Sequence, residues 1–508
     1  MIKGILVSTG ALTAIMIIGK IFGFVNQTLI AFVYGANTNT DIFFLASGLI
    51  SNLFYSVTSG LVVIVLPIYK VYSEQYGKEK SECFITKVSS FFLIISFAIY
   101  CILFFLAPII SKILAPSYTS NELSIMINYI RVLGISIFFV FTINIYTAVL
   151  NANRKYVLAR SVSCIYSLVS IIFISLFSKK MGVMALVLAF PISYFIQLLF
   201  VQYGTRQYVK IHFTLNCFEH ETKDLLIKLG PVLIGSATIQ INQFIDRMLA
   251  SMLEPGAVSA LSYSAVFNDF VSVVFVSSII TVLFTELSET AAKSDNIRLT
   301  KFLRNGIINI NIILIPVSII TFMNSTSIVT IIYGRGAFSS DAIHLTAQAL
   351  QFYSIGFLFE GIRELIAKTF YAFGNTKTPT YYGVLSVVLN IILSIVLSRF
   401  MGIGGITLAT SMSALISSFL LLRSLKSILP EVKFSLLFSS LGKVVIAGTI
   451  EIILIFFLSK ISFFDSQLLK FIVTVSIACL VYLLSLKFLK CYEIIQLTEK
   501  IKNIIRRK

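Results

Sequence analysis

Long apolar runs, separated by short polar segments, dominate the pattern along this chain. A helix needs about 20 mostly apolar residues to cross a bilayer, and on that measure the sequence predicts about fourteen spans. The expected spans are residues 6–34, 42–68, 85–110, 123–150, 157–177, 182–203, 226–252, 258–287, 302–323, 345–373, 380–400, 403–424, 440–459 and 468–489. The pattern predicts an all-α polytopic membrane protein.

Basic residues alternate between the loops. Loops after even-numbered spans are rich in Lys and Arg, whereas residues 35–40 and 253–257, after odd-numbered spans, carry none. Lys179, Lys180 and Arg335 are among the residues that depart from this alternation. Because positively charged loops stay on the cytoplasmic side, we expect both termini in the cytoplasm and the chain in a bacterial inner membrane.

The chain repeats itself at one spacing. Ser178–Ala189 recurs as Ser398–Ala409, and Phe24–Leu29 recurs at the same offset as Phe244–Leu249. A third pair, Asn151–Lys155 and Phe373–Lys377, has nearly the same offset. Internal repeats of this length are typical of transporters.

The repeat predicts a domain organisation. We expect two six-helix lobes of the same orientation, because spans one to six match spans seven to twelve. The expected divisions are an N-lobe (1–203), a cytoplasmic linker (204–225), a C-lobe (226–425), and a last part with two further helices and a basic tail (426–508).

Composition excludes several classes of protein. The chain is 57% hydrophobic and 12% charged, far more apolar than a soluble domain. Its net charge of +18 suits cytoplasmic loops facing anionic lipid better than nucleic acid. The six cysteines form no C-x-x-C pair, and no phosphate-binding G-x-x-x-x-G-K-[ST] loop occurs. We therefore expect a transporter rather than an enzyme or an ATP-driven pump, with no cofactor.

Several motifs resemble one transporter family. Gly19–Gln27, Thr40–Ala46, Gly334–Phe338 and above all Phe370–Pro379 (FYAFGNTKTP) are similar to the motifs of the MurJ/MviN family of lipid-linked oligosaccharide flippases, in the MOP superfamily. The resemblance covers roughly residues 5–425. It implies two lobes in a V around a central cavity, and transfer of undecaprenyl-diphosphate-linked sugars from the inner to the outer leaflet.

The resemblance also implies a cationic cavity wall for the cargo's diphosphate, and here the sequence departs from the family. Its two arginine positions on span one hold Lys20 and Asn26, and those on span two fall near Phe54 and Tyr55. A further arginine position falls at Val266, with Asp269 three residues on. These changes favour another lipid-linked glycan as cargo, with the peptidoglycan precursor as the alternative.

The candidate substrate-binding residues are Lys20, Asn26, Asp41, Asp269 and Arg363. Charges within spans usually face a cavity or a partner, so Lys20 is expected to bind phosphate or to pair with Asp41. Asp41 is also placed to cap a helix N-terminus. Arg363 lies with Glu360, Glu364 and Lys368 on one expected helix, where the i,i+4 spacing predicts internal ion pairs; gating between lobes is the alternative.

Asp246 and Asn375 are candidates for coupling transport to a cation. Asp246, with Arg247, occupies the repeat position of Asn26 and Gln27. The alternatives are a solvated Asp246–Arg247 pair and a turn-forming Asn375. Na⁺, H⁺ and the membrane potential are the candidate driving forces.

The expected function is a flippase for lipid II or a related precursor, working by alternating access. The alternatives are an O-antigen or exopolysaccharide-unit translocase, a MATE-like cation-coupled exporter, and a membrane scaffold that has lost transport. The expected partners are the lipid-linked glycan, membrane lipids and proteins of cell-envelope glycan assembly, with no nucleic acid.

Overall fold

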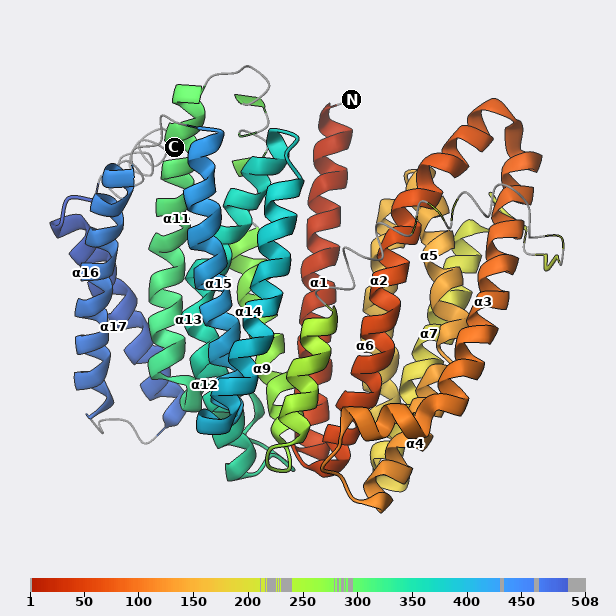
Figure 1. Ribbon diagram of the computed structural model, residues 1–508, viewed down its shortest axis with the longest axis horizontal. Helices are drawn as coiled ribbons and strands as arrows, with labels where there is room; N and C mark the ends of the chain where they lie inside the picture. Colours follow the sequence, from red (N-terminus) through yellow and green to blue (C-terminus); the bar gives the residue numbers. More distant parts are fainter. Residues whose placement is uncertain are drawn as a thin grey trace. The chain divides into compact units, whose positions relative to one another are not determined.

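The computed structural model describes residues 2–210, 240–277, 296–429, 434–460 and 466–491, with isolated positions between 212 and 290 (Figure 1). Every regular element within these ranges is a helix. Residues 217–224 of the expected linker, the first part of the expected span 226–252 and the basic tail from 492 onward lie largely or wholly outside them. The prediction of an all-α protein is confirmed.

By proximity of Cα atoms the chain forms two compact units. Unit 1 comprises Met1–Ser259 with Gly336–Ser339, and unit 2 comprises Ala260–Arg335 with Ser340–Lys508. The lobe boundaries expected from the repeat, 1–203 and 226–425, stay a prediction.

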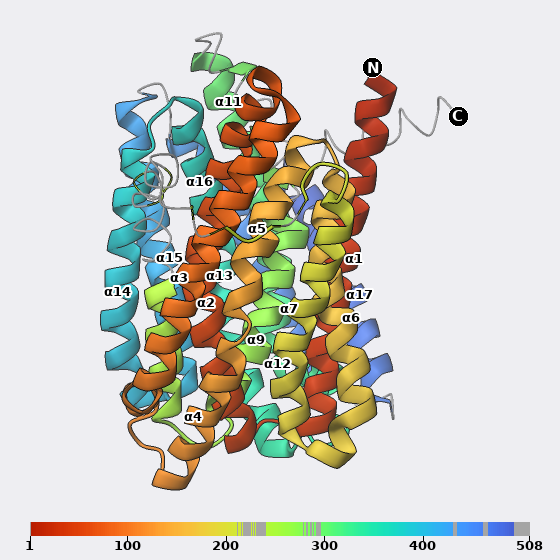
Figure 2. The same cartoon turned by 90° about the vertical axis from the view of Figure 1, so that its right-hand side faces the viewer.

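Unit 1 is a bundle of long helices. They are α1 (Ile2–Tyr34), α2 (Thr38–Gln75), α3 (Gly77–Leu114), α4 (Ser120–Gly134), α5 (Ile137–Ala152), α6 (Tyr156–Met181) and α7 (Val183–Thr205). Residues 240–251 are also helical. Helix α1 packs on α6, α2 packs on α3 and α5, and α6 packs on α7 (Figure 2).

Unit 2 holds the remaining described helices. They are α9 (Ala257–Val271, starting in unit 1), the π-helical η1 (Ser272–Ser277), α11 (Asn296–Met323), α12 (Ser325–Tyr333), α13 (Ser340–Ala372), α14 (Lys377–Met401), α15 (Ile403–Ser424), η2 (Leu425–Ser427), α16 (Phe434–Ser459) and α17 (Gln467–Phe488). Helix α13 packs on α11 and α15, and α16 packs on α11 and α17.

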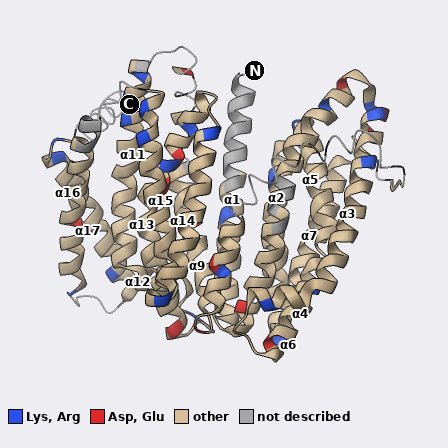
Figure 3. Ribbon diagram, in the orientation of Figure 1, with Lys and Arg blue, Asp and Glu red and all other residues tan. Residues whose placement is uncertain are grey.

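The described helices suit a membrane protein. Eleven helical segments in the described ranges are long and apolar enough to cross a bilayer, where α4 with α5 and α9 with η1 each count as one segment. Charged residues gather mostly toward helix ends (Figure 3). The expected fourth span is two helices, α4 and α5, that meet at Ile135 and Ser136. The short helix α12, between the ninth and tenth expected spans, was not predicted because a helix this short cannot cross a bilayer and leaves no span signal.

Two sharp turns show the internal repeat at atomic level. Helix α6 ends at Gly182 with φ 56° and ψ −142°, and α14 ends at Gly402 with φ 56° and ψ −132°. Each glycine donates its N–H to the carbonyl of the serine one helical turn earlier, Ser178 or Ser398, at 2.9 and 3.0 Å. Only glycine adopts this backbone region readily. The two copies therefore share one helix–turn–helix geometry.

Candidate functional site

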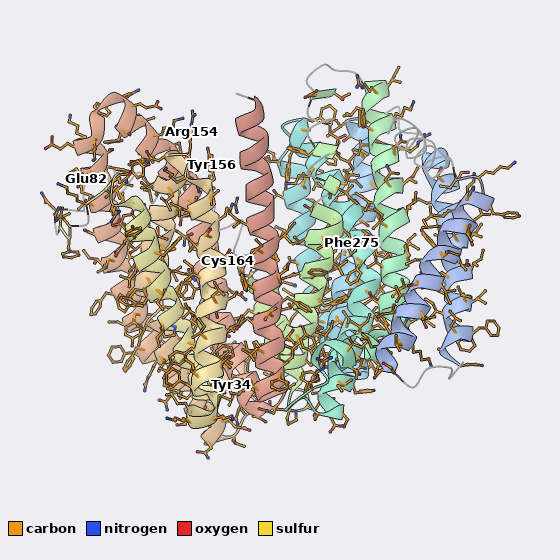
Figure 4. The ribbon with its side chains drawn as sticks, turned by 180° about the vertical axis from the view of Figure 1, so that it is seen from behind. Tyr34, Glu82, Arg154, Tyr156, Cys164 and Phe275 are labelled. Carbon is orange, nitrogen blue, oxygen red and sulfur yellow. The ribbon has the colours of Figure 1, made fainter. Side chains whose placement is uncertain are left out.

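The expected cargo positions on α1 differ in their surroundings. Lys20 is exposed, whereas Asn26 is buried. The side-chain oxygens of Asn26 and Gln27 are buried without a hydrogen-bond partner among the described residues. Glycines on another face pack on α6, where Gly19 lies against Cys164 (Figure 4). Lys20 and Asn26 therefore do not share one environment.

Asp41 caps a helix other than its own. Its two carboxylate oxygens accept the N–H groups of Gly256 and Ser259, each at 2.7 Å, at the start of α9. The Ser259 hydroxyl also lies within hydrogen-bond distance of Asp41. The α2 N-terminus is capped instead by Asn37, which accepts from the Thr40 N–H. Asp41 therefore does cap a helix N-terminus, which was one of its expected roles. The expected Lys20–Asp41 ion pair is absent from the described contacts.

Asp246 is buried. The alternative of a solvated Asp246–Arg247 pair is therefore wrong as far as the Asp246 side chain is concerned. Its Oδ2 accepts a hydrogen bond from the Asn242 side chain at 3.2 Å. The Arg247 guanidinium packs tightly on α2, since a Cβ built on Gly48 would lie 1.5 Å from Nη1. Gly48 is thus needed to let the guanidinium approach the α2 backbone. The role of Asp246 in cation coupling stays a prediction.

Phe54, near one family arginine position, belongs to an aromatic cluster. Its ring centroid lies 6.1 Å from that of Phe141, which lies 5.6 Å from that of Phe92. The Tyr55 side chain is outside the described part of the chain. Phe54 therefore makes an apolar core contact.

Asn375 takes part in a local turn, and Asp269 is exposed. Asn375 Oδ1 accepts from the Thr378 N–H at 3.1 Å, and its Nδ2 donates to the Thr378 hydroxyl at 3.0 Å. This is the turn-forming arrangement that was the alternative to cation binding. Cation binding by Asn375 stays a prediction. Asp269 is exposed on α9 and is not among the residues that line the cavity described next.

Unit 2 contains a charged cavity of about 340 Å³. It is lined by Ser272, Val276, Glu360, Arg363, Glu364, Ala367, Lys368, Tyr371, Pro379, Gly383, Ser417 and Leu421. These residues come from η1, which Phe275 marks in Figure 4, and from α13, α14 and α15. A π-helical turn often marks a functional site, and here it supplies Ser272.

The four charges on α13 line this cavity without forming close ion pairs with one another. Among the described residues, no ion pair within 4.0 Å joins Glu360, Arg363, Glu364 and Lys368. The Ser272 hydroxyl donates to Glu360 at 3.4 Å, and Lys368 Nζ lies 5.7 Å from the centre of the Phe284 ring. The expected close ion pairs are therefore wrong: the spacing places the four side chains on one helix face, where they line the cavity.

Glu451 on α16 is the other notable acid of unit 2. It is fully buried, and neither carboxylate oxygen has a hydrogen-bond partner in the described part of the chain. The nearby Tyr482 hydroxyl donates to the Ile312 carbonyl at 3.1 Å.

Ser272 and Tyr371 are among the residues of the charged cavity that the sequence analysis did not single out. Tyr371 lies within the FYAFGNTKTP motif, so that signal was available. Ser272 had none, because its contact with Glu360 joins residues 88 positions apart. Among the described residues, no cluster of His, Cys, Asp or Glu could hold a metal ion.

Comparison with known proteins identifies the family. The family model described as lipid II flippase MurJ matches residues 7–479. The chain is 27% identical over 502 residues to a probable lipid II flippase MurJ of Buchnera aphidicola subsp. Schizaphis graminum, covering 95% of this chain and 96% of the relative. It is 28% identical over 432 residues to that of Borreliella burgdorferi, covering 82% and 84%.

Solved structures share the fold. A lipid II flippase MurJ in an inward closed conformation matches with a TM-score of 0.81 and 24% identity, over 94% of this chain and 98% of that one. An inward-facing MATE family transporter of the MOP superfamily matches with a TM-score of 0.63 and 13% identity, over 83% and 99%. The chain belongs to the MurJ family of lipid II flippases and is an integral membrane transporter, not an enzyme.

Proposed function

We propose that this protein moves lipid II from the inner to the outer leaflet by alternating access. The observation that carries the proposal is the match of the lipid II flippase model over residues 7–479, nearly the whole chain. The relatives with which it aligns almost end to end are named probable lipid II flippases. The preference for another glycan rested on lost arginines, and these comparisons favour lipid II instead.

A MATE-like exporter is the weaker candidate. The MATE structure is matched almost to its full length by 83% of this chain, whereas the MurJ structure is matched by 94%. The repeated helix–turn–helix supports alternating access, because transporters of this kind rock one repeat against the other. Lys20 is the candidate to meet the diphosphate, since it is exposed and lies within the first span.

Replacement of a resident lipid II flippase tests this function. The chain is expressed in a bacterium whose own flippase is depleted, and lipid II in the outer leaflet is measured with an impermeant reagent. We expect growth and outer-leaflet lipid II to be restored. Absence of both, with the chain present in the membrane at normal level, contradicts the proposal. Dissipating the Na⁺ gradient, the H⁺ gradient or the membrane potential in turn identifies the driving force.

Orientation is tested separately with single cysteines in a cysteine-free chain. Asn39 and Lys78 are both exposed and lie near opposite ends of α2. Positive loops on the cytoplasmic side lead us to expect that an impermeant thiol reagent labels Asn39→Cys in intact cells and Lys78→Cys only after permeabilisation. The reverse pattern would place the termini outside the cytoplasm.

A further inference from the structure

The charged cavity of unit 2 carries equal numbers of acids and bases on one helix. Glu360, Arg363, Glu364 and Lys368 all line it, and all four are half-buried. Since the rise of an α-helix is 1.5 Å per residue, the stripe from 360 to 368 is about 12 Å long. Within that length negative and positive side chains alternate along α13.

This balance disfavours ligands of a single sign. A diphosphate would meet the positive Arg363 and Lys368 but also two carboxylates, and like charges at short range repel. A bare metal cation would meet the same conflict with the bases. A ligand that carries both an ammonium and a carboxylate can satisfy both kinds of side chain at once, and a guanidinium suits a carboxylate because of its forked donors.

We propose that this cavity binds a zwitterionic group, with the ammonium toward Glu360 and Glu364 and the carboxylate toward Arg363 and Lys368. Amino acids and short peptides are the chemical class that fits, and a volume of about 340 Å³ lies within the range of small-ligand sites. This inference rests on the proposed function in one respect: the zwitterion is taken to be an amino-acid part of the cargo headgroup.

Small residues also line the cavity. They are Ala367 on α13, Gly383 on α14 and Ser417 on α15. A Cβ built on Gly383 meets no heavy atom within 4 Å. A larger side chain at 383 can therefore fill the cavity while leaving the four charges and the helix α14 in place.

Binding of three matched peptides tests the proposal with the full-length chain in lipid nanodiscs. Triglycine is the zwitterion, N-acetyl-triglycine keeps only the carboxylate, and triglycinamide keeps only the ammonium. Fully extended, three residues span about 10 Å, close to the length of the stripe. We expect saturable binding of triglycine below about 10 mM, at least about ten-fold tighter than either blocked peptide.

Charge variants then assign each end of the ligand. Glu360→Gln is expected to remove the advantage of triglycine over N-acetyl-triglycine, and Arg363→Gln its advantage over triglycinamide. Gly383→Leu should abolish binding of all three peptides at an unchanged melting temperature. The matched controls are Glu74→Gln and Lys70→Gln, because these residues form an exposed ion pair at 3.8 Å on α2 and should leave binding unchanged.

The outcomes separate this inference from the proposed function. Lack of triglycine binding up to about 10 mM, equal binding of the three peptides by the native chain, or native binding by Gly383→Leu each overturns the zwitterion site. If the native chain still moves lipid II in that case, the proposed function stands alone. If triglycine binds as expected but lipid II is not moved, the site stands and the proposed function fails.

Discussion

The two copies of the internal repeat share the backbone of one helix–turn–helix and differ in the side chains that join its helices. In unit 1, α6 and α7 join at Gly182, and in unit 2, α14 and α15 join at Gly402, with φ 56° at both. Between the helices of the first copy, the Tyr166 ring lies 5.7 Å from that of Phe190, centroid to centroid. The equivalent residues of the second copy are Ser386 and Thr410.

In the second copy these positions belong to a hydrogen-bonded contact. Asn390 donates to the Thr410 hydroxyl at 3.0 Å, and Ser386 donates to the Ser413 carbonyl at 3.2 Å. The glycine turn is therefore the same in both copies, whereas the helix–helix contact is aromatic in the first and polar in the second. The unit with the polar contact is also the one that holds the charged cavity.

The largest effect is expected at Lys20, which breaks the symmetry of the repeat. Its counterpart in the second copy is the uncharged Gln240. A diphosphate entering a region of low dielectric needs a compensating charge, so we expect Lys20→Ala to abolish transport, Lys20→Arg to preserve it, and Gln240→Ala to have little effect. The measurement is outer-leaflet lipid II at equal protein level. Normal transport by Lys20→Ala would make Lys20 a structural residue.

The next effect concerns the two helix–helix contacts. Phe190 is buried, and its truncation to alanine should cost about 3 kcal/mol through lost burial and the cavity left behind. Thr410→Ala removes a hydrogen bond between helices and should cost about 1 kcal/mol. Unfolding in mixed micelles measures both. Equal losses would show that the aromatic and the polar contact stabilise their copies to the same degree.

A smaller effect is expected at the two glycine turns. Gly182→Ala and Gly402→Ala each force a side chain into a backbone region that suits glycine, at about 1–3 kcal/mol. The two variants should lose the same amount, because the backbone angles nearly coincide. Gly442→Ala is the matched control, since it is helical and a Cβ there meets no atom within 4 Å. A neutral Gly182→Ala would mean that the turn can change shape.

Much of the fold could be predicted from the sequence because a bilayer leaves few choices. Backbone polar groups in hydrocarbon must be satisfied within the helix, so apolar runs of about 20 residues become helices. The recurrence of Ser178–Ala189 as Ser398–Ala409 indicated the repeat that contains the two glycine turns, and the FYAFGNTKTP motif indicated the family. The candidate site was predicted less well, although its four charges on α13 were named.

The tertiary structure decided which groups each charged side chain contacts. From spacing alone, Glu364 and Lys368 were expected to pair, yet they face the charged cavity because η1, α14 and α15 leave space beside them. Asp41 was expected to pair with Lys20 or to cap a helix N-terminus. It accepts the N–H groups of Gly256 and Ser259, which lie far along the chain at the start of α9. Sequence periodicity determines which side chains share a helix face, whereas the partner across that face comes from elements distant in the chain.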